Sequence, residues 1–310
     1  MPFQLQVQIT GFGPSFGGSL NGARTESLKT ADIIRAAIVA GHPDRASLDS
    51  RIIAWRTASI RLALEISPLP PSIPRNLLHP KAWKSLEPSE KAGLQNILGN
   101  TVTKLLSERL LDAPRMWFLD VYKKDFSINI PKGQRPDFFA KTKGGQWLSL
   151  EAKGRANAPS TKSLGLAKTQ AKVLKKIKGS KVAARVVCWT MSRRGVLEAR
   201  LHDPEGVDED KQFTLDVEDT RLLKDYYGPV ETLMAASEPV EYGPRLTLFR
   251  FLAGDFLIGL HPIVQEALHI GEPGSLLARF DEGQLAFEPV GNVTSGPDGI
   301  IVVPGRSWPE

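Results

Sequence analysis

The chain has 310 residues, of which 41% are hydrophobic, and a formal net charge of +6 at pH 7. This length and apolar content are enough for one large hydrophobic core or two modest ones. No apolar run approaches the roughly 20 residues that span a bilayer, and the single cysteine, Cys188, excludes an internal disulfide. We therefore expect a cytoplasmic protein that makes no contact with a membrane.

The first 87 residues are expected to form a mostly helical amino-terminal region. Residues 1–10 have the pattern of a strand, whereas residues 25–66 are typical of helix. The glycine-rich stretch at residues 11–18 does not fit a dinucleotide-binding loop, because its spacing is wrong and Pro14 falls where the helix would begin. Four prolines between positions 68 and 74 mark the end of this region.

A long helix is predicted over residues 88–113. Pro88 is tolerated in a first helical turn, and Pro114 would end the helix. Residues 116–121 and 125–130 then have the pattern of two strands. The apolar stripe of the predicted helix consists of Leu94, Leu98, Val102, Leu105 and Leu106.

The segment from residue 135 to residue 155 predicts a β-hairpin around the turn Lys143-Gly144-Gly145. Glycine supplies the positive backbone angles that tight turns need. With these three residues as the loop, Asp137 lies opposite Glu151 on strands about 4.8 Å apart. The odd positions from 147 to 153 share one face, and the apolar even positions share the other face and are expected to pack on the core.

Asp137, Glu151 and Lys153 are therefore expected to converge. Neighbouring carboxylates repel each other unless a cation holds them, and ligands made only of oxygen suit a hard ion such as Mg²⁺. Such an ion polarises a phosphoryl group and lowers the pKa of an attacking water, while a nearby lysine orients that water or stabilises the developing charge. The cluster predicts a metal site for phosphodiester hydrolysis, with ordinary surface charges on an exposed hairpin as the alternative.

The segment after the hairpin is strongly basic. From Ala152 to Leu197 there is no aspartate or glutamate, whereas twelve lysines and arginines occur. Beside a carboxylate cluster this run favours contact with phosphate backbones, although a solvated helix face is the usual explanation of such runs. The residues expected to contact nucleic acid are Arg155, Lys162, Lys168, Lys172, Lys175 and Lys176.

Residues 164–178 predict a helix, and residues 183–190 predict a buried strand. Apolar residues recur at helical spacing in the first segment, with Gln170 on the same stripe. A polar side chain there needs a hydrogen-bond partner or an opening of the active site. The apolar residues of the stripe are Leu166, Val173 and Ile177.

Pro136-Asp137 followed by Glu151-Ala152-Lys153 resembles the signature of the PD-(D/E)xK nuclease superfamily, which has the restriction-endonuclease-like fold. The resemblance covers roughly residues 88–190 and includes Gly154-Arg155 after the motif. It implies an α/β core with a mixed central sheet flanked by helices, in which Asp137 and Glu151 bind metal and Lys153 assists the chemistry. It also implies Mg²⁺ as cofactor, with Mn²⁺ as a substitute, and DNA as the partner.

Two further site residues follow from this resemblance. Gln170 lies 17 residues after Lys153, similar to a glutamine in some members of the superfamily, and is expected to assist catalysis; a helix-surface glutamine is the alternative. Those members have a tyrosine where this chain has Leu174. The family commonly has a metal-binding glutamate where this chain has Asn100, so Glu108, eight residues on, is an alternative metal ligand unless it faces solvent.

We expect three regions, which are the amino-terminal residues 1–87, a nuclease-like core at 88–200 and a mixed α/β extension at 201–310. The expected function is a magnesium-dependent endonuclease acting on DNA, with duplex favoured, and the resemblance implies restriction, antiphage defence or repair. The alternative is a catalytically inactive nucleic-acid-binding subunit of a larger defence or repair complex. A third interpretation is a structural or interaction protein whose basic run binds an acidic partner chain.

Overall fold

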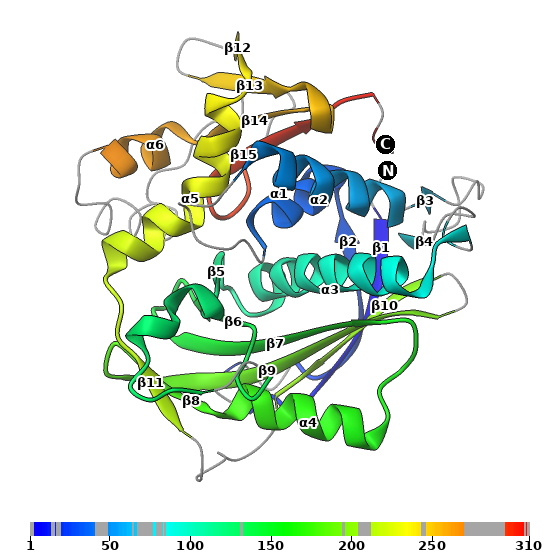
Figure 1. Ribbon diagram of the computed structural model, residues 1–310, viewed down its shortest axis with the longest axis vertical. Coiled ribbons are helices and arrows are strands. Elements are labelled where there is room, and N and C mark those ends of the chain that lie inside the picture. Colours follow the sequence, from blue (N-terminus) through cyan, green and yellow to red (C-terminus); the bar gives the residue numbers. More distant parts are fainter. Residues whose placement is uncertain are drawn as a thin grey trace.

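The computed structural model describes residues 3–13, 16, 20–40, 49–63, 65–66, 77–78, 83, 85–130, 133–193, 196–203, 212–242, 246–269, 295–306 and 308. These residues form an α/β structure in which helices flank a mixed central sheet, as the sequence predicts (Figure 1).

The central sheet consists of the strands β1 (Phe3–Thr10), β2 (Gly22–Leu28), β3 (Glu65–Ile66), β4 (Leu77–Leu78), β5 (Arg115–Phe118), β6 (Phe138–Lys141), β7 (Trp147–Arg155), β8 (Leu174–Ile177), β9 (Ser180–Arg193), β10 (Val196–His202) and β11 (Phe213–Leu215). Its main path runs β2-β1-β10-β9-β7-β6-β5. β1 pairs in parallel with β10, β7 with β9, and β8 with β11. The sheet is therefore mixed, with a parallel pair at its centre.

The helices are α1 (Thr30–Val39), α2 (Ser50–Ala63), α3 (Pro88–Leu110), α4 (Thr161–Lys172), α5 (Asp219–Ala235) and α6 (Pro262–His269), with the short 3₁₀ helices η4 (Leu119–Asp125) and η5 (Leu252–Gly254). α3 lies on one face of the central sheet and α4 on the other (Figure 1). α1 and α2 pack against the side of α3 that faces away from the sheet. α4 and the short strand β8 lie between the parallel strands β7 and β9 in the chain. α3 and α4 each contact both of these strands, which are therefore covered on both faces.

A second sheet lies at the far end of the molecule from α4. It consists of β12 (Glu238–Glu241), β13 (Thr247–Phe251), β14 (Phe256–Leu260) and β15 (Ile300–Pro304), in that order. One hydrophobic core extends from Phe3 to Trp308 and includes buried residues of all three expected regions. The amino-terminal region also supplies β1 and β2 to the central sheet, so it contributes strands as well as helices.

The elements before the hairpin match the sequence in part. The helix predicted over residues 88–113 is α3, with Pro88 in its first turn, and it ends at Leu110. The strand predicted at 116–121 is shorter and is β5. The strand predicted at 125–130 is wrong, because the chain there follows η4 and Phe126 makes only an isolated bridge to Leu215.

The helix predicted over residues 164–178 is also wrong in its second half. α4 ends at Lys172, and β8 then pairs antiparallel with β9. Lys178 and Gly179 both have positive φ, 50° and 75°, which is the geometry of a tight two-residue hairpin turn. Leu174 and Ile177 are buried by this pairing, so they face the core from a strand. The strand predicted at 183–190 lies within β9.

Two glycines allow α3 to lie directly on the end of β7. A Cβ atom on Gly99 would lie 2.7 Å from the backbone nitrogen of Gly154, and one on Gly154 would overlap the carbonyl oxygen of Gln95. Both closest neighbours are backbone atoms, which cannot rotate away as a flexible side chain can. The close approach fixes the helix against the strand that carries Glu151 and Lys153.

Gly154→Ala is therefore expected to destabilise the protein by at least about 2 kcal/mol, because the added methyl group forces α3 away from β7. Chemical denaturation in urea measures this loss. Gly93→Ala is the matched control, since Gly93 is exposed on the same helix and a Cβ there meets nothing within 4 Å. The control is expected to gain about 0.5–1 kcal/mol. Equal stability of the two variants would contradict the close contact.

Candidate functional site

The predicted hairpin is formed by β6 and β7. Lys141 pairs with Trp147 and Phe138 with Leu150, which is the register expected from a three-residue loop. The loop is closed by the Thr142 amide, which donates to the Gln146 carbonyl at 2.9 Å, and Gly145 adopts a φ of 81°. The register predicted from the glycine turn is confirmed.

This register brings Asp137 and Glu151 together. The Asp137 amide donates to Glu151 Oε2 at 3.1 Å, and the Ala152 amide donates to Asp137 Oδ2 at 3.1 Å. Lys153 Nζ donates to Glu151 Oε1 and forms an ion pair with it. The predicted convergence of the two carboxylates and the ammonium group is therefore present.

Both faces of β7 are buried, so the face with the odd-numbered residues is covered as well as the apolar face that was expected to pack on the core. The side chains of Ser149 and Glu151 are fully buried, and Ser149 Oγ donates to the Ala171 carbonyl of α4 at 2.8 Å. α4 thus covers the face that carries Glu151. The Lys153 side chain stays 20% exposed, so the site opens to solvent at the end of the strand.

Burial raises the pKa of both carboxyl groups. The pKa of Glu151 rises from its ordinary value of 4.5 to about 8, mainly because burial penalises its charge and secondly because Asp137 repels it. The pKa of Asp137 is also raised, mainly by burial, and Asp120 adds to the rise. Lys153 opposes the rise in both groups. In the absence of another cation, the ionised forms of Asp137 and Glu151 are therefore disfavoured in the folded protein.

Asp120 and Arg135 belong to the surroundings of the site and were not expected from the sequence. Arg135 Nε donates to Asp120 Oδ1 at 2.7 Å, and Arg135 also donates to the Ile130 carbonyl. Asp120 lies on η4, at the end of the first of the two strands predicted there. No sequence motif marks this pair, because it depends on how η4 folds back towards the start of the hairpin.

Gln170 of α4 contacts the segment that precedes Asp137. Its amide donates to the Gly133 carbonyl at 2.8 Å, four residues before Asp137. The apolar stripe predicted around it is not buried as a whole, since Leu166 is 60% exposed and the buried face of α4 is formed by Ala167 and Ala171. Gln170 therefore holds the segment that leads to Asp137 through this hydrogen bond.

Glu108 does not join the carboxylate pair. Its side chain is buried, and Arg35 donates to both of its oxygens at 2.6 and 2.7 Å. Lys104 also forms an ion pair with it. The expectation of a metal ligand or a solvent-facing glutamate at this position is wrong, because both oxygens are used by a buried cluster of charges. Asn100 is buried on α3.

The expected nucleic-acid contacts lie on three elements. Lys162, Lys168 and Lys172 are on α4, where Lys162 is exposed and the other two are partly exposed. Lys175 and Lys176 lie on β8 instead of on the predicted helix, and Arg155 is exposed at the end of β7. α4 contains no acidic residue, so its outer surface carries positive charge beside the end of β7.

The donor set at Asp137 and Glu151 fits a magnesium ion. Within the described part of the chain, no group of three or more histidine, cysteine, aspartate or glutamate side chains is arranged to hold a metal. Mg²⁺ does not need such a group, because it is commonly bound by one or two carboxylates and completes its shell with water and substrate phosphate. Two carboxylates with raised pKa at an opening to solvent match this mode of binding.

Among the described residues, no helix is both long and apolar enough to cross a bilayer. Comparisons with protein-family models, with curated proteins and with solved protein structures found no match for this chain.

The raised pKa of Glu151 predicts how stability depends on pH when a chelator removes metal ions. Between pH 4.5 and about 8 the folded chain keeps a proton on Glu151 that the unfolded chain has lost. The stability that this group contributes is therefore complete below pH 4.5 and is lost as pH rises towards 8. Urea denaturation at several pH values is expected to show this loss in the wild type and a smaller loss in Glu151→Gln.

Glu266→Gln is the control for this series, because Glu266 is exposed on α6. It is expected to follow the wild-type curve. If Glu151→Gln also follows that curve, the carboxyl of Glu151 ionises normally. The description of a buried Glu151 carboxyl that is repelled by Asp137 is then wrong.

Proposed function

We propose that the protein is a magnesium-dependent DNA endonuclease whose active site consists of Asp137, Glu151 and Lys153. The observation that carries this proposal is the convergence of one buried carboxylate, one partly buried carboxylate and one ammonium group at the open end of a strand, with the pKa of both carboxyl groups raised. Such a site favours a divalent cation and a negatively charged substrate. A phosphodiester supplies that charge and also a bond that such chemistry can hydrolyse.

Asp137 and Glu151 would hold the ion. When bound, Mg²⁺ lowers the pKa of an attacking water and neutralises charge on the phosphoryl oxygens. The amides of Asp137 and Ala152 hold the two carboxylates in a fixed relation, so little reorganisation is needed when the substrate arrives. Gln170 supports this arrangement by fixing the segment before Asp137.

Lys153 would act on the substrate itself. Its ammonium group is paired with the buried carboxylate of Glu151 while its side chain is partly exposed to solvent, so it can reach a substrate bound at the opening. In hydrolysis a water oxygen forms a bond to phosphorus, one ester bond breaks, and negative charge grows on the phosphoryl oxygens. An ammonium group at this position stabilises the charge that develops in the transition state, or orients the attacking water.

The basic surface supports nucleic acid as the substrate. Arg155 and the lysines of α4 lie next to the end of β7, and the segment from Ala152 to Leu197 contains no acidic residue. Phosphate contacts with such a surface release counterions and supply affinity without reading sequence. The substrate is therefore a nucleic acid held mainly by its backbone, and the restriction, antiphage or repair role suggested by the motif is compatible with this.

The first test concerns the chemistry. Asp137→Ala and Glu151→Ala are expected to abolish magnesium-dependent cleavage of plasmid and linear DNA. Glu108→Gln is the control: the fraction of this variant that folds is expected to cleave DNA as the wild type does. Lys153→Ala is expected to lower the cleavage rate at saturating DNA by about 100-fold or more, with little change in DNA affinity in Ca²⁺. Lys153→Arg is also expected to fail, because the planar guanidinium does not fit the place of a compact ammonium group.

Gel assays with Mg²⁺ and with chelator measure cleavage, and binding is measured in Ca²⁺, which fills oxygen sites but supports catalysis poorly. Full activity of Asp137→Ala or Glu151→Ala would refute the proposed active site. DNA binding by the wild type without any metal-dependent cleavage would instead identify a binding subunit that has lost turnover.

The second test concerns the basic surface. Replacing Lys162 and Lys168 with alanine is expected to weaken DNA binding for all sequences alike. The slope of log affinity against log salt is expected to become shallower by about 0.9 for each phosphate that the variant no longer neutralises. Lys29→Ala and Lys224→Ala are the controls, because both lysines are exposed and lie away from α4. An unchanged slope in the double variant of α4 would show that these lysines are only solvated.

A further inference from the structure

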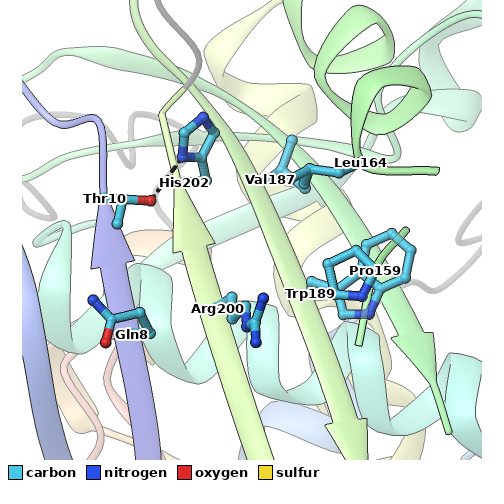
Figure 2. Close-up of a pocket in the computed structure, with 8 residues that line it drawn as sticks. All are labelled: Gln8, Thr10, Pro159, Leu164, Val187, Trp189, Arg200 and His202. Atoms are coloured by element: carbon cyan, nitrogen blue, oxygen red, sulfur yellow. Dashed lines mark hydrogen bonds between the residues drawn. The ribbon is translucent and has the colours of Figure 1, made fainter. Parts of the chain in front are cut away.

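A pocket of about 160 Å³ opens on the face of the central sheet that carries Glu151. Figure 2 shows its side chains, which come from β1, β9 and β10 and from the start of α4 with the segment before it. Val187 of β9 packs against Ala167 and Ala171 of α4, so the pocket lies beside α4 on the covered face of the sheet. The lining residues are Gln8, Thr10, Pro159, Leu164, Val187, Trp189, Arg200 and His202.

The strand register connects this pocket to the proposed active site. Glu151 pairs with Val187 and Lys153 pairs with Trp189, so the floor of the pocket lies one strand away from the two reactive side chains. Val187 pairs in turn with His202, and Trp189 with Arg200. Paired residues share a face, and neighbouring strands are about 4.8 Å apart. The pocket is therefore within the reach of a single nucleotide of a strand bound at Glu151 and Lys153.

The two walls of the pocket differ in chemistry. Pro159, Leu164, Val187 and Trp189 form an apolar wall, and Trp189 is held in place by donating its indole N–H to the Asn157 carbonyl at 3.2 Å. The opposite wall carries an amide, a hydroxyl, a guanidinium and an imidazole, from Gln8, Thr10, Arg200 and His202.

Two of these polar groups already fix each other, because Thr10 Oγ1 and His202 Nδ1 lie 2.7 Å apart. Gln8 and Arg200 are exposed and lie side by side on neighbouring strands (Figure 2). A nucleobase has apolar faces, a rim of donors and acceptors, and a phosphate attached nearby. An apolar wall, an adaptable amide and an arginine match these three features.

The pocket is large enough for one base and too small for a base pair. An apolar cavity of about 150 Å³ holds a single benzene ring, so about 160 Å³ admits one ring system near an open mouth. A base inside a duplex is stacked on both sides and cannot enter such a site unless it leaves the stack. We infer that this pocket binds one unpaired nucleotide of the DNA strand, an inference that rests on the proposed nuclease function.

The test compares two DNA duplexes of equal length, one fully paired and one with a single unpaired nucleotide, in Ca²⁺ so that binding is measured alone. The wild type is expected to prefer the duplex with the unpaired nucleotide by about tenfold, the value of one base held by stacking and pocket contacts. Arg200→Ala removes the cation of the polar wall, and Leu164→Trp fills the pocket without changing charge. Both are expected to abolish most of this preference while changing affinity for the paired duplex by less than about twofold.

Arg250→Ala is the control for the removal of a positive charge, because Arg250 is exposed on β13 in the second sheet. It is expected to keep the preference of about tenfold. Equal wild-type binding of the two duplexes would overturn the pocket inference, as would an equal decrease in affinity for both duplexes in Arg200→Ala and Leu164→Trp. Cleavage in Mg²⁺ separates this outcome from failure of the proposed function. A protein that cleaves without the preference refutes the pocket alone, whereas one that shows the preference and never cleaves refutes the nuclease and keeps the pocket.

Discussion

The close approach of Asp137 to the buried carboxylate of Glu151 is the physical constraint on which the centre of this molecule depends. Asp137 and Glu151 accept hydrogen bonds from backbone amides of the hairpin, and Lys153 supplies the nearest positive charge. α3 closes one face of the strand through the contact of Gly99 with Gly154, and α4 closes the other face. These contacts exclude water, and the exclusion of water raises the pKa of both groups. Asp137 also repels the charge of Glu151, and a divalent cation bound between the two groups would relieve that repulsion.

A second buried group of charges holds α3 from the opposite side. Arg35 of α1 donates to Glu108 and, at 3.0 Å, to Asp298, and Tyr226 of α5 donates to Asp298 at 2.6 Å. Burial lowers the pKa of Lys104 to about 7. Breaking such a buried pair by removing one partner costs about 3–5 kcal/mol. Arg35 near the start of the chain and Asp298 near its end therefore both fix the helix that packs on the strand with Glu151 and Lys153.

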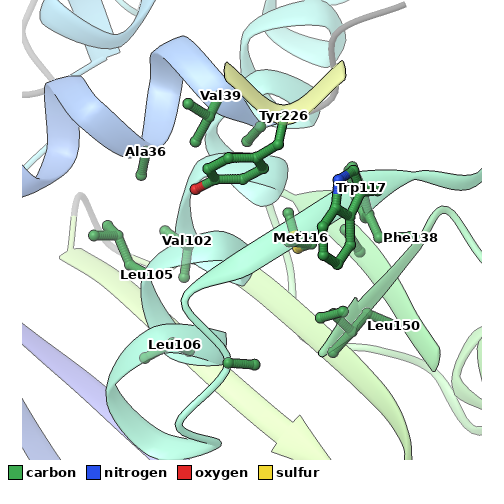
Figure 3. Packing of buried hydrophobic residues seen from close by; sticks show 14 of the residues in the cluster. Ala36, Val39, Val102, Leu105, Leu106, Met116, Trp117, Phe138, Leu150 and Tyr226 are labelled. Atoms are coloured by element: carbon green, nitrogen blue, oxygen red, sulfur yellow. The ribbon is translucent and has the colours of Figure 1, made fainter. Parts of the chain in front are cut away.

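Hydrophobic packing also holds α3 and the central sheet against the helices α1 and α5. In Figure 3 the ring of Tyr226 lies between Ala36 and Val39 of α1 and the side chain of Val102 on α3. Trp117 of β5 stacks on Phe139 of β6, with 5.4 Å between the ring centroids, and its indole donates to the Leu222 carbonyl of α5 at 2.7 Å. α5 thus packs on the same sheet that carries the hairpin. Helices from before and after the hairpin in the chain therefore pack around the sheet that carries it.

Local patterns in the sequence were sufficient to predict the hairpin and its register. A turn with two glycines and a side-chain period of two determine which residues lie opposite each other, so Asp137 and Glu151 could be paired without any structure. The helix predicted over residues 164–178 failed because Val173 and Ile177 match helical spacing with Leu166 by coincidence. The turn at Lys178 and Gly179 was the missed signal.

Long-range partners could not be predicted in the same way. The role of Glu108 depends on Arg35, which lies 73 residues earlier, and on a helix packing that no local pattern reveals. The pair of Arg135 with Asp120 likewise depends on how η4 folds. The pocket at Trp189 and Arg200 requires β1 to lie beside β10 in parallel, a pairing between segments that are far apart in the sequence.

Calorimetric titration of Mg²⁺ into the full chain at pH 7, in two buffers that differ in ionisation enthalpy, tests the central claim most directly. With the pKa of Glu151 at about 8, its carboxyl is mostly protonated before the metal arrives. Binding is therefore expected to release about one proton for each ion, and Glu151→Gln is expected to lose both the proton release and most of the affinity. Binding of equal strength in both proteins, with no proton released, would contradict a metal site at Asp137 and Glu151.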